Sequence, residues 1–202
     1  MPTWAIVPVK PFREAKSRLS PVLDPEERAA LSRSFLAHTL DVLSQVREVT
    51  KALVISRDTA ALQVARKHGA FTVTESGAPE LNAALTRATD VSVSSGADAV
   101  LIVPSDLPLL TAAEVLAFIR TLRSGSGVCI APDRHNSGTN ALFLRPPRAM
   151  PYMFGAQSFA RHTAWAGERG LQTEIYRAPA FGLDVDLPED WELFQASQLV
   201  QK

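Results

Sequence analysis

The 202-residue sequence has one cysteine, no excess of charge of either sign and no long apolar stretch. A single cysteine excludes an internal disulfide and a cysteine-based zinc site, and its apolar surroundings, GVCIAP, indicate a buried core residue. Because 21 basic residues balance 21 acidic ones, no overall field attracts the chain to nucleic acid or an anionic membrane. No window approaches the ~20 apolar residues that a membrane-spanning helix needs.

The amino-terminal segment, MPTWAIVPVKPF, lacks the basic start and the apolar core of a secretory signal peptide. We therefore expect a cytoplasmic protein that binds neither nucleic acid nor membrane. The length predicts one domain spanning residues 1–202, because single domains commonly contain ~100–200 residues. We expect a monomer or a homodimer, since the sequence favours neither.

Short β-rich segments alternate with amphipathic segments along the chain. The predicted strands are TWAIVPV (3–9), KALVIS (51–56), FTVT (71–74), ADAVLIV (97–103), GVCIAP (127–132), ALFLR (141–145) and TEIYR (173–177). Helices are expected after Asp24, where Glu27 completes a capping box, and over about 59–68, 80–93, 112–122, 158–169 and 188–199. This alternation predicts an α/β domain with a largely parallel sheet covered by helices on both faces.

A basic loop follows the first predicted strand, and ligands of such sheets bind beyond the carboxyl ends of the strands. The loop contains four cationic residues in nine positions, and Lys10, Lys16 and Arg18 are placed to bind a triphosphate by charge-assisted hydrogen bonds. It contains no glycine, so it is neither a GxxxxGK[ST] nor a GxGxxG loop, and side chains must do more of the binding. An ordinary solvated loop is the alternative.

Carboxylates follow two later segments. Asp106 stands at the end of ADAVLIV, between two prolines, where it suits a hard cation. Asp184 and Asp186 are two residues apart, so in an extended segment both side chains point to the same side. The three carboxylates are therefore candidates for one divalent metal site. The alternatives are that Asp106 caps the following turn and that Asp186 caps the last helix.

Two polar turns complete the set of candidate ligand-binding segments. Residues 133–140 join two apolar strands, and Gly138 would let backbone N–H groups approach an anion. Gly155 precedes a helix that begins near Ser158, whose first free N–H groups suit a phosphate or a carboxylate. An ordinary turn and a simple Ser158 helix cap are the alternatives.

Several of these segments together resemble one family over nearly the whole chain. They are, in order, VPVKPFREAKSRL, DPEERAAL, PSDLPLL, APDRHNSGTNALFL, FGAQSF and LDVDLPEDW. They are similar to the guanylyltransferases of coenzyme F420 biosynthesis, called CofC in archaea and FbiD in many bacteria. The resemblance implies a single three-layer α/β domain with a mixed, mostly parallel sheet, the nucleotide-diphospho-sugar transferase (GT-A-like) fold.

The resemblance also implies a reaction. GMP would pass from GTP to the phosphate of a small phosphorylated three-carbon acid, with release of pyrophosphate. Phosphoenolpyruvate is the favoured acid, and 2-phospho-L-lactate and 3-phospho-D-glycerate are the others. The alternatives are another nucleotidyltransferase of the same fold, cytidylyl or sugar-nucleotide, and a non-catalytic GTP-binding protein. The absence of a glycine-rich loop argues against the sugar-nucleotide enzymes.

Each set of residues receives a role from the resemblance. The GTP phosphates would contact the cations of the first loop, Lys10, Lys16 and Arg18, and the catalytic residues would be Lys10, Lys16 and Asp106. Mg²⁺ would be bound by Asp106, Asp184 and Asp186. The acceptor acid would contact Thr139, Gly155 and Ser158, and the base and ribose would lie near Ser56, Leu81 and Asn82. This chain has Glu80 where relatives often have glycine, which leaves the guanosine contacts the least defined.

Overall fold

The computed structural model describes residues 1–122 and 125–200. Its seven-stranded sheet has the order β3-β2-β1-β4-β6-β5-β7. The strands are β1 (Thr3–Pro8), β2 (Val49–Ser56), β3 (Phe71–Thr74), β4 (Ala99–Ile102), β5 (Gly127–Pro132), β6 (Thr139–Arg145) and β7 (Thr173–Ile175). Only β6 runs antiparallel to its neighbours, so the sheet is mixed and mostly parallel, which confirms the predicted fold class.

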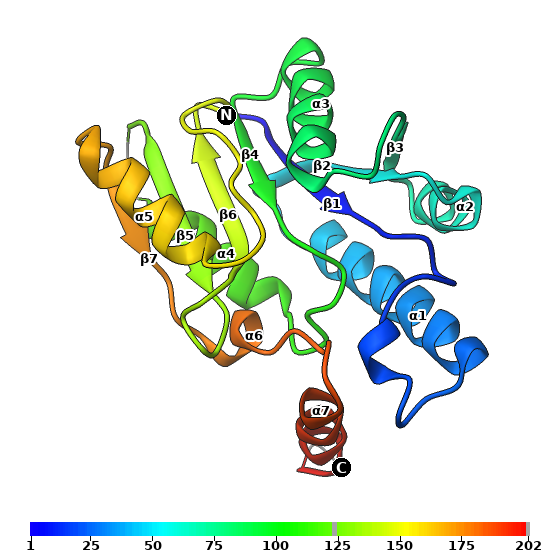
Figure 1. Ribbon diagram of the computed structural model, residues 1–202. Coiled ribbons are helices and arrows are strands. Elements are labelled where there is room, and N and C mark those ends of the chain that lie inside the picture. The colour runs from blue at the N-terminus through cyan, green and yellow to red at the C-terminus, as the bar shows by residue number, and fades with distance from the viewer. Residues whose placement is uncertain (123–124, 201–202) are drawn as a thin grey trace.

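Helices cover both faces of the sheet and make three layers (Figure 1). One face packs against α1 (Pro25–Ser44), α2 (Thr59–Lys67), α4 (Ala112–Thr121) and α6 (Pro179–Gly182). The other face packs against α3 (Leu81–Ser94) and α5 (Ser158–Glu168). Alternate strand residues enter the two apolar layers: Ala5 and Val7 of β1 face the first, whereas Trp4 and Ile6 face the second.

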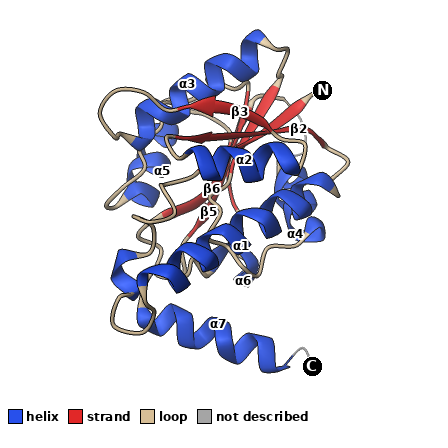
Figure 2. Ribbon diagram, turned by 90° about the vertical axis from the view of Figure 1, so that its right-hand side faces the viewer, coloured by secondary structure: helices blue, strands red, loops and turns tan. Residues whose placement is uncertain are grey.

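The carboxyl-terminal helix α7 (Pro188–Val200) lies outside the three layers, below α1 in Figure 2. It packs on the short 3₁₀ helix η1 (Ser17–Leu19) of the basic loop. Phe35 of α1 and Phe194 of α7 meet edge to face with ring centroids 5.5 Å apart, next to the fully buried Leu19. This small apolar cluster joins the basic loop to the segment that carries Asp184 and Asp186.

Local sequence signals explain how α1 begins. The Asp24 carboxylate accepts hydrogen bonds from the backbone N–H groups of Glu26 and Glu27, and the Glu27 carboxylate accepts one from Asp24 N–H, all at 2.8 Å. The predicted capping box is therefore confirmed, with Pro25 at the first helical position. The short elements η1 and α6 were not predicted, because three- and four-residue turns carry no periodic pattern.

Cys129 lies fully buried in the middle of β5. Burial, reinforced by the charge of Glu174, raises the pKa of its thiol to about 12. The cysteine is thus a core residue, as its apolar neighbours predicted. None of the helices within residues 1–122 and 125–200 has the length and apolar character needed to cross a membrane.

Candidate active site

A cavity of about 420 Å³ opens beyond the carboxyl ends of β1, β2, β3 and β4. The residues that follow these four strands and line the cavity are Val9, Arg57, Glu75 and Asp106. Five of the predicted site residues line it: Lys10, Lys16, Leu81, Asp106 and Asp186. The expectation that ligand-binding groups gather at this edge of the sheet therefore agrees with the geometry.

Lys16 joins the basic loop to two of the predicted metal-binding carboxylates. Its Nζ donates to Asp106 Oδ2 at 2.8 Å and lies 3.9 Å from Asp186 Oδ1. The side chain is only 6% exposed, and an ammonium group at that depth needs charged partners. Its backbone is left-handed, with φ of 57°, which a lysine rarely adopts. The fold thus holds Lys16 in a costly conformation directly over the end of β4.

The outer cation of the loop reaches the same acidic group. Arg18 Nη1 donates to Asp186 Oδ2 at 3.2 Å, and the arginine side chain is exposed. Lys10 lines the cavity and forms no ion pair with any residue that the structure describes. Of the three predicted phosphate ligands, Lys10 is therefore the one whose charge is not already matched by a carboxylate of the protein.

Asp184 does not line the cavity and contacts Asn140 of β6. Its Oδ1 accepts a hydrogen bond from Asn140 Nδ2 at 3.1 Å, and the backbone N–H of Val185 donates to the Asp106 carbonyl at 3.1 Å. Burial, and then the negative charge of Asp106, raise the pKa of the Asp184 carboxyl above its ordinary value. The negative charge of Asp106 thus disfavours the ionised form of Asp184.

The charges around the cavity are predominantly acidic. The lining contains the cations Lys10, Lys16 and Arg57 and the carboxylates Glu14, Glu75, Glu80, Asp106 and Asp186. Arg57 is already paired with Glu75, its Nη2 lying 2.9 Å from Oε1. A bound triphosphate would add further negative charge, so a hard divalent cation on Asp106 and the neighbouring aspartates fits this lining.

A magnesium ion at this place would depend on the substrate for part of its ligand set. Within residues 1–122 and 125–200, no group of three or more His, Cys, Asp or Glu side chains is arranged to hold a metal. Mg²⁺ is usually bound through one or two carboxylates together with substrate phosphates and water. The donor set therefore fits Mg²⁺ without containing a complete protein cage, and the metal role of Asp106, Asp184 and Asp186 stays a prediction.

The predicted acceptor residues gather beside α5, outside the lining of the cavity. The backbone N–H of Thr139 donates to Ser158 Oγ at 2.8 Å. Gly155 has φ of +115°, a conformation that favours glycine. Because β6 is antiparallel, its first residue, Thr139, lies at the same edge of the sheet as the carboxyl ends of the other strands.

Asn82 connects the first turn of α3 to the loop before α5. Its Oδ1 accepts from Phe154 N–H at 2.8 Å, and its Nδ2 donates to the Phe154 carbonyl at 3.3 Å. Both ends of the amide predicted to lie near the base and ribose are therefore bound to the backbone next to Gly155. Leu81 lines the cavity and is 42% exposed. Ser56 is fully buried, accepts from Asp58 N–H at 3.0 Å and does not line the cavity.

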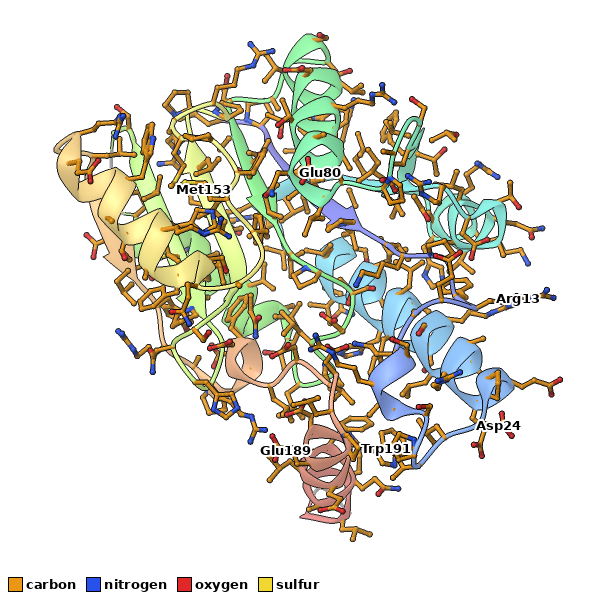
Figure 3. All side chains as sticks on the ribbon, in the orientation of Figure 1. Arg13, Asp24, Glu80, Met153, Glu189 and Trp191 are labelled. Carbon is orange, nitrogen blue, oxygen red and sulfur yellow. The ribbon has the colours of Figure 1, made fainter. Side chains whose placement is uncertain are left out.

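Glu80 has a local structural role at the start of α3. Its carboxylate accepts hydrogen bonds from the backbone N–H groups of Asn82 and Ala83 and so caps α3. These two hydrogen bonds lower the pKa of the Glu80 carboxyl. Figure 3 shows Glu80 at the start of α3, near the middle of the molecule, whereas Arg13 of the basic loop points outward at its edge.

The turn between β5 and β6 binds its own carboxylate. Asp133 Oδ1 accepts from the N–H groups of His135 at 3.1 Å and Ser137 at 2.8 Å, and Oδ2 accepts from Gly138 at 2.7 Å. These N–H groups were expected to approach an external anion. Because Asp133 already accepts from them, they are not available to an external anion.

Three residues of the region were not predicted. Arg57 and Glu75 line the cavity and directly follow β2 and β3, so the rule that identified Asp106 also applies to them. His162 lies fully buried behind Thr139, with its Nδ1 2.9 Å from Thr139 Oγ1. It stands four residues after Ser158 and hence on the same face of α5, which is the signal that the sequence offered.

Acid is expected to destabilise the protein through His162. Burial, and then the charge of Arg161, lower the pKa of this histidine from 6.5 to about 4. The folded pKa is below the unfolded one, so between these values the unfolded chain binds more protons and stability falls as the pH falls. The difference corresponds to about 3 kcal/mol between pH 7 and pH 4.

Urea unfolding of the wild type and of His162→Asn at several pH values measures this effect. The substitution should reduce the loss of unfolding free energy between pH 7 and pH 4 by about 3 kcal/mol, the contribution of His162. His135→Asn, at an exposed loop position, should leave the loss unchanged. Equal pH dependence in the wild type and in His162→Asn would contradict the assignment.

Comparison with known proteins identifies the family. Residues 3–196 match the family model described as "Guanylyl transferase CofC like". The chain is 43% identical over 192 residues to the phosphoenolpyruvate guanylyltransferase of Sphaerobacter thermophilus, covering 95% of this chain and 92% of the relative. It is 41% identical over 190 residues to the 2-phospho-L-lactate guanylyltransferase of Methanothermobacter thermautotrophicus, covering 94% of this chain and 82% of the relative.

Solved structures share the fold at low sequence identity. A putative nucleotide-diphospho-sugar transferase from Desulfovibrio desulfuricans G20 superposes with a TM-score of 0.79 at 16% identity, covering 98% of this chain and 88% of that one. A nucleotidyl transferase from Methanothermobacter superposes with a TM-score of 0.72 at 17% identity, covering 99% of both chains. The sheet and its helical layers thus follow the nucleotide-diphospho-sugar transferase fold, and the chain belongs to the family of CofC-like guanylyl transferases.

Proposed function

We propose that this guanylyltransferase moves GMP from GTP to the phosphate of phosphoenolpyruvate and releases pyrophosphate, in the biosynthesis of coenzyme F420. The observation that carries the proposal is the position of Lys16. Its ammonium group fixes the basic loop to Asp106 and Asp186 at the wall of a cavity of about 420 Å³. Cations, carboxylates and space for a nucleotide thereby meet at one edge of the sheet.

In this proposal the nucleotide lies in the cavity and the acid lies beside it. The triphosphate contacts Lys10, Lys16 and Arg18. The base and ribose lie towards Leu81 at the first turn of α3, which lines the cavity. The acceptor's carboxylate and phosphate contact Thr139, Ser158 and the backbone at Gly155.

The chemistry needs no covalent enzyme intermediate. An oxygen of the acceptor phosphate attacks the α-phosphorus of GTP in line with the bond to the β-phosphate. The new P–O bond forms as the bond to the leaving pyrophosphate breaks. A phosphate oxygen is already ionised, so the step needs no strong base, and positioning and charge stabilisation provide the catalysis. Lys10 and Lys16 offset the charge that develops on the pyrophosphate.

We assign the binding of Mg²⁺ to Asp106 with Asp184 and Asp186. When bound, the ion would polarise the phosphate oxygens and lower the repulsion between the two anionic substrates. Lys16 keeps the Asp106 and Asp186 side chains in place, and Asn140 does the same for Asp184.

The choice of acceptor follows from the relatives. The enzymes of Sphaerobacter thermophilus and Rubrobacter xylanophilus, 43% and 41% identical, are both phosphoenolpyruvate guanylyltransferases. The Rubrobacter enzyme is covered to 97% of its length by the whole of this chain. We therefore place phosphoenolpyruvate before 2-phospho-L-lactate and 3-phospho-D-glycerate.

One assay tests the nucleotide, the acid and the metal together. Purified protein is given each of the four nucleoside triphosphates with each of the three acids and Mg²⁺, and pyrophosphate release is followed. GTP with phosphoenolpyruvate should be faster than any other pair, by about tenfold or more. About tenfold is the discrimination that a pocket commonly achieves between substrates that differ by one small group. Chelation by EDTA should stop the reaction, and added Mg²⁺ should restore it.

Each alternative has its own result in the same assay. Faster turnover with CTP would identify a cytidylyltransferase of this fold, and turnover with a sugar phosphate would identify a sugar-nucleotide enzyme. GTP binding without pyrophosphate release in the presence of any acid would identify a non-catalytic nucleotide-binding protein.

A further inference from the structure

His162 lies between β6 and the loop before α5, and one hydrogen bond defines where its proton sits. The backbone N–H of Met153 donates to His162 Nε2 at 3.0 Å. A backbone N–H can only donate, so Nε2 carries no hydrogen. The buried ring is neutral near pH 7, since its pKa is about 4, and its one proton is therefore on Nδ1.

This tautomer sets the direction of the next hydrogen bond. His162 Nδ1 and Thr139 Oγ1 are 2.9 Å apart, and with the proton on Nδ1 the histidine donates and the threonine accepts. The hydrogen of the Thr139 hydroxyl must then point to another acceptor. No acceptor for it is present among residues 1–122 and 125–200.

The Ser158 hydroxyl also has a hydrogen without an acceptor among residues 1–122 and 125–200. Its Oγ accepts the backbone N–H of Thr139 at 2.8 Å, so its own hydrogen is also directed elsewhere. The two residues are 2% and 7% exposed, Ser158 being the more buried. Buried hydroxyl groups normally find an acceptor. Two neighbouring hydroxyl donors that have no acceptor in the described part of the protein indicate a place for an anionic oxygen from a ligand.

We propose that His162 is a positioning residue that holds the Thr139 hydroxyl as a hydrogen-bond donor towards an anionic oxygen of the acceptor acid. The inference rests on the proposed function, because the acid is the ligand that brings the oxygen. Met153 N–H, His162 and Thr139 form a series of hydrogen bonds in which every donor points towards the acid. The Ser158 hydroxyl, which accepts from the backbone N–H of Thr139, is the second donor.

Two substitutions remove the two hydrogen bonds of His162 one at a time. Asparagine carries its polar atoms at the δ position, so His162→Asn still donates to Thr139 but no longer accepts from Met153. Glutamine carries them at the ε position, so His162→Gln still accepts from Met153 but no longer donates to Thr139. Each variant loses one buried hydrogen bond, and the two are therefore matched in structural cost.

The KM for the acceptor acid is the readout. His162→Gln should raise it by about fivefold, the effect of one hydrogen bond, and should leave the KM for GTP unchanged. His162→Asn should keep the acceptor KM within about twofold of wild type. In a Thr139→Val background, His162→Gln should add less than about twofold, since the hydroxyl that it positions is gone.

An equal rise of the acceptor KM in both His162 variants would overturn the proposal, because it would indicate only a packing role. So would a full fivefold effect of His162→Gln in the Thr139→Val background. Nitrogen NMR of the ¹⁵N-labelled wild type provides a measurement that does not need turnover. It should show the proton on Nδ1, and a proton on Nε2 would overturn the inference even if GMP transfer is observed.

Failure of the proposed function gives a different pattern. In that case the wild type releases no pyrophosphate with any of the three acids. Titration of each acid into the protein, followed by the His162 NMR signals, then tests the donor pair alone. A shift of these signals in the wild type that is absent in Thr139→Val supports the inference, and no shift with any acid contradicts it.

Discussion

Asp106→Asn is expected to lower kcat for GMP transfer by about a thousandfold. Asp106 is proposed to hold the metal, and a bound metal would contribute several kcal/mol of transition-state stabilisation. Asparagine keeps the shape of the side chain at the end of β4. Lys16 retains Asp186 at 3.9 Å, so the loop above the cavity keeps one charged partner. Circular dichroism should therefore show an intact fold, and steady-state pyrophosphate release at saturating substrate should show the loss.

Asp90→Asn is the matched control. Asp90 is an exposed carboxylate on α3 whose Oδ1 lies 2.6 Å from Arg148 Nη2, away from the cavity lining. Both substitutions remove one charge from an ion pair, but exposed pairs contribute little, so Asp90→Asn should leave kcat within about twofold. If Asp106→Asn has turnover near that of wild type, the metal assignment and the proposed chemistry at this end of the cavity are wrong.

Lys16→Met is expected to lower kcat/KM for GTP by about a hundredfold, the effect of one positioned group that stabilises charge in the transition state. Methionine replaces the aliphatic part of the lysine side chain and fills most of the buried volume, but it leaves Asp106 and Asp186 without their shared ammonium group. In the proposed reaction the leaving pyrophosphate would also lose a cation. Lys16→Arg should recover part of the activity, since a guanidinium keeps the charge but not the compact shape.

Lys51→Met tests whether any lysine would have the same effect. Lys51 is an exposed residue of β2 whose Nζ lies 4.9 Å above the centre of the Trp4 ring, away from the cavity lining. Its replacement should leave kcat/KM for GTP unchanged. If Lys16→Met also left kcat/KM for GTP unchanged, the contact between Lys16 and Asp106 would serve stability alone.

The sequence was sufficient to predict how strands and helices alternate and which side chains stand at strand ends. Asp106 and Lys16 follow buried strands, and parallel strands bring their carboxyl ends to one edge. Periodicity does not reveal strand direction, and β6 is the strand that runs the other way. The first residue of an antiparallel strand is found only from the pairing, so Thr139 entered the predicted site through the family resemblance.

Contacts between segments that are far apart along the chain could not be predicted from the sequence. Asn82 binds the backbone of Phe154, 72 residues away, and His162 reaches Thr139 from a helix on one face of the sheet. Neither pair belongs to a periodic pattern, because each joins segments whose packing the sequence pattern does not specify. The cap that Glu80 provides for α3 is local, yet serine, threonine, aspartate and asparagine are the residues that sequence rules expect there.

The burial of Cys129 has a practical value for following this enzyme in solution. The only thiol of the chain lies inside β5 with a pKa of about 12, so at neutral pH it is neither accessible nor ionised. A cysteine placed at Arg13, which points outward from the basic loop, would be the single site for a thiol-reactive fluorophore. The native sequence therefore already serves as the unlabelled background for a fluorescence measurement of nucleotide binding.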